Sequence, residues 1–130
     1  MTAAVTDDDR ATFRRDGVIA LRGVLPLELV ESLTAPVAEA MVDPDTTADM
    51  TELRRSLGGT GDGGGRFLSG VDHWRRIPAL RSFALDSPLP ELVAELLESS
   101  TLRLYEDSVL VKEPGTRAPT MFHQDLSYFS

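Results

Sequence analysis

The chain contains no cysteine among its 130 residues. A disulfide framework, a thiolate metal site and a cysteine nucleophile are therefore excluded, and a reducing cytoplasm is the expected compartment. Positive charge is also scarce, because 13 Lys and Arg stand against 21 Asp and Glu and give a formal net charge of −8. Nucleic acids and anionic membrane surfaces are bound through clustered Lys and Arg, so we expect neither as a partner.

Long apolar runs are missing as well. No stretch approaches the roughly 18 consecutive apolar residues of a transmembrane helix. The segment from Met1 to Arg10 is acidic and lacks the basic and apolar regions of a signal peptide. Hydrophobic residues nevertheless make up 42% of the chain, which is ordinary for a globular protein. We therefore expect a single domain over residues 1–130.

Helical patterns dominate residues 1–100. Thr6 and Asp9 have the spacing of a capping box, and Gly17 is a typical helix end. Apolar residues recur at spacings of three and four from Leu27 to Met41, and Pro36 is expected to kink or break this helix. Further expected elements are a weakly helical polar segment at 45–57, helices at 74–83 and 88–97, and short strands at 18–21 and 66–70.

A glycine-rich segment at 58–65 holds six of the ten glycines and is expected to be a mobile loop. Gly59, Gly61 and Gly64 spell the G-x-G-x-x-G pattern of dinucleotide-binding loops. That pattern binds phosphates only between a buried strand and the N-terminus of a helix. Polar residues precede it here and Arg66 follows it, so nucleotide binding is not expected.

Residues 101–130 are patterned as a β-hairpin. A strand is expected from Leu102 to Lys112, and its apolar run at 109–111 predicts burial on both faces. The segment from Glu113 to Thr116 has the central Pro-Gly of a type II turn. A second strand is expected over residues 120–128. The fold class is therefore α+β, with helices first and a C-terminal hairpin.

His123 and Asp125 are separated by one residue on the second expected strand. Side chains at i and i+2 of a strand point to the same face, so the imidazole and the carboxylate are expected to project together. Together they supply two of the three ligands in the 2-His-1-carboxylate triad of non-haem Fe(II) oxygenases. An exposed polar pair on an edge strand is the alternative interpretation of so short a spacing.

The sequence around this pair resembles the core strand pair of the phytanoyl-CoA dioxygenase family. The resemblance rests on the strand end Lys112–Gly115, on the aromatic Phe122 where the family usually has Trp, and on the following His-Gln-Asp. Residues 13–25 are similar to the family's opening helix and first strand, and residues 74–97 to its middle helices. The resemblance covers nearly the whole chain but only the N-terminal half of the family's domain.

This resemblance implies a double-stranded β-helix (jelly roll) with helices outside, of which the chain would hold a truncated part. It implies Fe(II) held by His123 and Asp125, with 2-oxoglutarate converted to succinate and CO₂ while O₂ hydroxylates a small organic substrate. Asp125 favours oxygenation, because related halogenases carry a small residue at this position. The residues expected to line the co-substrate pocket are Lys112, Thr120, Gln124 and Tyr128.

The family supplies its distal His and its 2-oxoglutarate-binding Arg from strands well after the H-x-D pair, and this chain has only one other histidine, His73. Two alternatives to an active dioxygenase therefore stay open. In the first alternative the chain is an inactive fragment or a binding module. In the second its metal site recruits His73 as a further ligand. Beside Trp74, His73 is otherwise expected to belong to a partly buried structural pair. An unpaired C-terminal strand would also favour association between chains.

Overall fold

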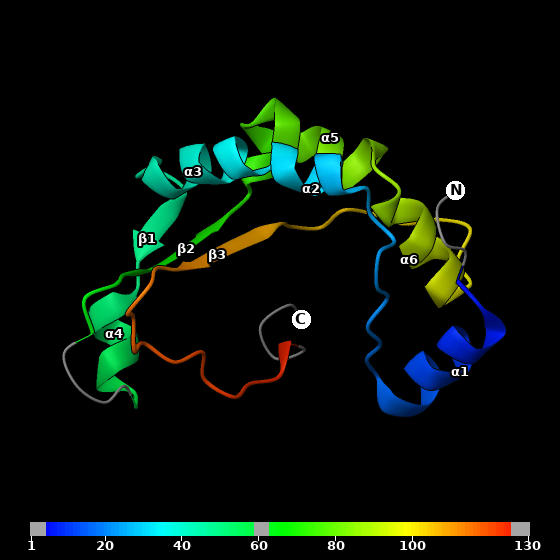
Figure 1. The fold of residues 1–130 in the computed structure, drawn as a ribbon, viewed down its shortest axis with the longest axis horizontal. Helices are drawn as coiled ribbons and strands as arrows, with labels where there is room; N and C mark the ends of the chain where they lie inside the picture. Colours follow the sequence, from blue (N-terminus) through cyan, green and yellow to red (C-terminus); the bar gives the residue numbers. More distant parts are fainter. Residues whose placement is uncertain (1–4, 59–62, 126–130) are drawn as a thin grey trace.

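The computed structural model describes residues 5–58 and 63–125. These residues form an arch, with helices on its outer side and a small sheet beneath them (Figure 1). Within the described residues the sheet is antiparallel with the order β1-β2-β3, and its strands are β1 (Thr47–Asp49), β2 (Phe67–Val71) and β3 (Ser108–Lys112). The helices are α1 (Asp7–Asp16), α2 (Leu27–Ser32), α3 (Thr34–Val42), α4 (Thr51–Ser56), α5 (Pro78–Asp86) and α6 (Leu89–Leu97), with the 3₁₀ turn η1 (His73–Arg75).

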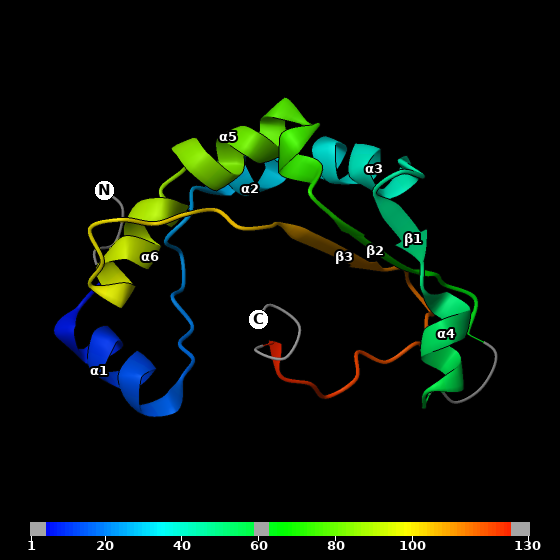
Figure 2. The ribbon, with the colours of Figure 1, turned by 180° about the vertical axis from the view of Figure 1, so that it is seen from behind.

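The view from behind shows the same order, with α2, α3 and α5 above the sheet and α4 and α1 at the two feet of the arch (Figure 2). The fold is therefore mixed α and β, as the sequence predicts. The three described strands do not make a jelly roll, so that part of the expectation stays a prediction. None of the helices in the described ranges has the length and hydropathy that a membrane span requires.

Helix α1 begins and ends where the local signals predict. The Thr6 hydroxyl accepts a hydrogen bond from the Asp9 N–H at 3.1 Å, and the Asp9 carboxylate accepts one from the Thr6 N–H at 2.9 Å. This reciprocal capping box satisfies two backbone donors at the start of the helix. At the other end Gly17 adopts a left-handed conformation with φ of 72°, and its N–H donates to the Phe13 carbonyl. Capping therefore defines both ends of α1.

The break expected near Pro36 lies one turn before it. Helix α2 ends at Ser32 and α3 begins at Thr34, with Leu33 between them. Pro36 has no N–H to donate to the carbonyl of Ser32, four residues earlier, and its ring crowds that carbonyl. The helix is therefore interrupted at Leu33, whose N–H donates to the carbonyl of Val30, three residues earlier, as in a turn.

Two strand predictions are wrong. Residues 18–21 are not a strand, and Val18 is exposed, because none of the three described strands supplies a ladder for this segment. The strand expected from Leu102 begins only at Ser108, where its pairing with β2 begins. It is also not buried on both faces, since Leu110 is 57% exposed. In the segment expected to be weakly helical, β1 precedes the short helix α4.

The predicted turn after β3 is confirmed, but the predicted hairpin partner is wrong over its described part. The Thr116 N–H donates to the Glu113 carbonyl at 3.1 Å, and Gly115 has a φ of 84°, as a type II turn requires. Residues 120–124 form no strand, because β3 pairs with β2 from Phe67 opposite Lys112 onward. Residues 126–128, including the end expected to associate with other chains, lie outside the described residues.

The core lies between the outer helices and one face of the sheet. Ala40 of α3 packs with Ile77 and Leu80, and Val109 of β3 packs against this cluster. Because side chains alternate along a strand, Ser108, Leu110 and Lys112 point to the opposite, concave face, under the arch. Gly70 lies at a close approach on the helix side, where an added Cβ would collide with the Thr47 hydroxyl and the His73 ring.

Arg66 and Glu113 tie the start of β2 to the turn that follows β3. The Arg66 Nε donates to a Glu113 carboxylate oxygen at 3.0 Å, and the Arg66 backbone N–H donates to the other oxygen at 2.9 Å. These bonds favour the charged carboxylate and lower the pKa of Glu113 from its ordinary value of 4.5 to about 2. The pair therefore stabilises the fold only while Glu113 is ionised.

This linkage predicts a pH-dependent effect of Glu113→Gln. Since the pKa of Glu113 is lowered by folding, its contribution is fully present above a pH of 4.5 and is lost as the pH falls towards 2. Urea unfolding is expected to show the variant as less stable than the wild type at about pH 6. The difference in the free energy of unfolding should become smaller as the pH is lowered to about 3. The exposed pair of Arg55 and Glu52 supplies a control, since Glu52→Gln is expected to change stability little. A difference between wild type and Glu113→Gln that does not vary with pH would contradict the prediction.

Candidate metal site

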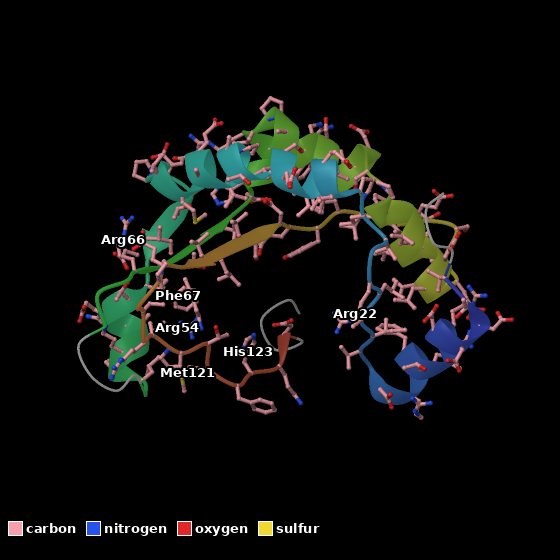
Figure 3. All side chains as sticks on the ribbon, viewed as in Figure 1. Arg22, Arg54, Arg66, Phe67, Met121 and His123 are labelled. Carbon is pink, nitrogen blue, oxygen red and sulfur yellow. The ribbon has the colours of Figure 1, made fainter. Side chains whose placement is uncertain are left out.

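His123 lies on the segment that leaves the turn after β3 and runs beneath the concave face of the sheet (Figure 3), and Asp125 follows it two residues later. The structure brings their side chains together, with the His123 Nε2 3.2 Å from the Asp125 Oδ1. The side chains are 59% and 73% exposed. Their proximity was expected from a strand, but the backbone of this segment is irregular. Local chain geometry therefore brings the two groups together without a ladder.

The Met121 carbonyl orients the His123 ring. Its oxygen lies 2.6 Å from the His123 Nδ1, and because a carbonyl oxygen can only accept, the Nδ1 carries the hydrogen. A neutral imidazole in this tautomer has its lone pair on Nε2, the nitrogen that faces Asp125. A backbone carbonyl on the far nitrogen is the usual outer partner of a metal-ligating histidine. The ring is thus held in the orientation that a metal ligand needs.

The two facing atoms have the spacing of neighbouring metal ligands. A neutral Nε2 and a carboxylate oxygen both present lone pairs, so they repel at this distance unless a proton or a metal ion lies between them. Two ligand atoms about 2.1 Å from one ion and at right angles to each other are about 3.0 Å apart. The observed 3.2 Å fits that arrangement. Within the described ranges, no third His, Cys, Asp or Glu joins the pair.

The other predicted site residues are exposed or lie outside the described residues. Lys112 is exposed at the end of β3, and Thr120 and Gln124 are exposed on the segment that carries His123. Tyr128 lies outside the described residues, as do two glycines of the G-x-G-x-x-G pattern, Gly59 and Gly61. The Met121 carbonyl was missed by sequence reasoning, since a backbone oxygen leaves no signal in the sequence.

His73 is a structural residue in this fold. It is completely buried, with its Nδ1 3.1 Å from the Thr46 hydroxyl and its Nε2 3.3 Å from the Thr47 hydroxyl. Both ring nitrogens are therefore occupied on the helix side of the sheet. Within the described residues, His73 belongs to no group of three or more His, Cys, Asp or Glu side chains that could hold a metal ion. The alternative in which His73 completes the iron site gains no support from this arrangement.

His73→Ala is expected to separate structure from metal binding. The free energy of unfolding should fall by about 1–3 kcal/mol, because the partly buried hydroxyls of Thr46 and Thr47 lose a partner. The Fe(II) affinity should stay within about twofold of the wild type, as for an independent site. Urea unfolding and Fe(II) titration measure the two effects. A large loss of affinity in a variant that still folds would restore His73 as a ligand.

Comparison with known families shows which family the chain belongs to. The model of the family described as phytanoyl-CoA dioxygenase (PhyH) matches residues 13–130. The chain belongs to the phytanoyl-CoA dioxygenase family. The match begins in α1 and includes both His123 and Asp125, and the family is one of oxygenases of the Fe(II)/2-oxoglutarate type. Searches of curated proteins and of solved structures gave no match.

Proposed function

We propose that this chain carries the metal-binding segment of an Fe(II)- and 2-oxoglutarate-dependent dioxygenase that hydroxylates a small organic substrate. The observation that carries the proposal is the 3.2 Å approach of the His123 Nε2 to the Asp125 Oδ1. Family membership supports the reaction class. The chemistry of the donors agrees with it, because an imidazole with a carboxylate is the ligand combination of non-haem Fe(II) oxygenases.

Each residue of the segment has a distinct part in this proposal. His123 and Asp125 would hold the metal, and the Met121 carbonyl keeps the imidazole in its ligating tautomer. Iron held there would, with 2-oxoglutarate as co-substrate, supply the activation of O₂, with 2-oxoglutarate converted to succinate and CO₂. The Asp125 carboxylate also offsets part of the positive charge of the ion. Because both side chains are exposed, small ligands could reach a metal ion that they held.

The proposal is tested on the purified 130-residue chain. Fe(II) is first titrated under anaerobic conditions, and 2-oxoglutarate and O₂ are then added while succinate is measured. We expect saturable Fe(II) binding and succinate release that requires Fe(II). Binding without any succinate would favour the alternative of a metal-binding module without turnover. Fe(II) binding that is indifferent to replacement of both His123 and Asp125 would overturn the proposed site.

A further inference from the structure

Two positive side chains converge on one buried ring at the concave face. The guanidinium carbon of Arg54, on α4, lies 5.8 Å from the centre of the Phe67 ring, and the Lys112 Nζ lies 5.0 Å from it. The two charges are therefore no more than about 11 Å apart, the sum of these distances. That limit is well within the screening length of about 30 Å at an ionic strength of about 10 mM, so the two charges repel each other at low salt.

Neither member of this pair forms a salt bridge with a carboxylate of the described residues. Neither Arg54 nor Lys112 has a described carboxylate within 4.0 Å, although acidic residues outnumber basic ones by 21 to 13 in the chain. Other arginines of the described residues do have such partners, namely Arg10, Arg14, Arg15, Arg55, Arg66, Arg75 and Arg76. The Arg54 Nε is in addition buried, and no described group accepts its hydrogen. A buried donor without an acceptor is costly, so an acceptor oxygen beside the Arg54 Nε would be favourable.

The pair faces the side of the sheet on which the candidate metal site lies. Figure 3 shows Arg54 and Phe67 on the inner side of the arch, above the segment that carries His123. Lys112 shares the concave face of the sheet, because it is directly opposite Phe67 in the register of β2 and β3. A molecule bound beneath the sheet could therefore approach both the cations and the H-x-D segment.

We propose that Arg54 and Lys112 form an anion-binding site that takes the carboxylate or phosphate group of the substrate. The assignment to a substrate rests on the proposed function, whereas anion binding itself does not. A guanidinium binds such oxygens through paired hydrogen bonds, and an ammonium adds a compact charge on a flexible stem. The substrate class is accordingly an anionic small molecule. Its acidic group would contact Arg54 and Lys112, while its reacting part extends towards His123.

Inorganic phosphate is the probe for the site. Its binding to the metal-free 130-residue chain is measured by calorimetry at an ionic strength of about 10 mM, where screening is weak. We expect saturable binding that weakens at least about tenfold in Arg54→Gln and in Lys112→Gln, as for loss of a charge-assisted hydrogen bond. The matched control is Arg81→Gln, because Arg81 also lies over an aromatic ring, that of Trp74, but on the outer helix α5. Equal phosphate binding in all four proteins would overturn the proposal.

A second readout separates ligand binding from a merely structural role. Without phosphate, Lys112→Gln is expected to raise the melting temperature at low salt, because it removes the repulsion between two uncompensated cations. If Lys112 served only to cover the Phe67 ring, the same variant would melt lower. Since Lys112 is exposed, its variant is expected to fold, and circular dichroism checks this. A lower melting temperature together with unchanged phosphate binding would contradict the anion site.

Two further experiments identify the source of the anion and distinguish the proposed anion site from the proposed iron site. His123→Ala is expected to leave phosphate binding unchanged, so a failed iron site and a failed anion site give different results. With Fe(II) present, 2-oxoglutarate is expected to leave phosphate bound, because this proposal assigns Lys112 to the acidic group of the substrate and not to the co-substrate pocket that the family resemblance implies. Displacement of phosphate by 2-oxoglutarate would assign the site to the co-substrate and overturn the substrate assignment.

Discussion

His123→Ala is expected to weaken Fe(II) binding to this chain by at least about 100-fold, beyond the 10- to 100-fold that loss of an outer-shell partner causes. The imidazole is one of two donors that converge in the described structure, with its Nε2 3.2 Å from the Asp125 Oδ1. Its removal leaves a single carboxylate, which binds a divalent ion weakly in water. Asp125→Ala is expected to have a loss of the same size, because it leaves a single imidazole.

The measurement is an anaerobic Fe(II) titration of the purified chain. The titration is monitored by calorimetry or by the absorbance of a competing chelator. Gln124→Ala is the matched control, because Gln124 lies between the two donors on the same exposed segment. Its affinity should stay close to that of the wild type. If Gln124→Ala lost as much affinity as His123→Ala, the effect would come from the shape of the segment and not from the ligands.

Phe67→Ala is expected to lower the free energy of unfolding by about 3–5 kcal/mol, the usual cost of truncating a buried phenylalanine. The ring is only 1% exposed at the start of β2. It is covered by α4 and by the end of β3, since Arg54 and Lys112 both lie over it. Because whole domains are stable by only about 5–15 kcal/mol, this one change removes a large share of the total.

Urea unfolding of Phe67→Ala and of Phe122→Ala compares the same substitution in opposite surroundings. Phe122 is fully exposed, so its variant is expected to stay within about 0.5 kcal/mol of the wild type. Fe(II) binding by Phe122→Ala tests in addition whether the aromatic residue before His123 matters to the metal site. Equal losses of stability in the two variants would show that the Phe67 ring is not part of the buried structure.

Predictions from short stretches of sequence agree with the structure where neighbouring residues alone decide the conformation. The capping box of Thr6 and Asp9, the left-handed Gly17 and the turn at Pro114-Gly115 depend on hydrogen bonds between residues three or four apart. The break before Pro36 follows from a missing N–H. Predictions failed where pairing partners decide the result. Residues 18–21 have strand-forming side chains but no neighbouring strand.

The sequence by itself determined the family, because residue types and their spacing carry that information. It also predicts the two donors of the candidate metal site. Only the tertiary structure decided what surrounds those donors. The Met121 carbonyl orients His123, the hydroxyls of Thr46 and Thr47 occupy the buried His73, and the register of β2 and β3 brings Lys112 to the ring that Arg54 also covers. These contacts join backbone groups or residues far apart in the chain, and packing, not local preference, sets them.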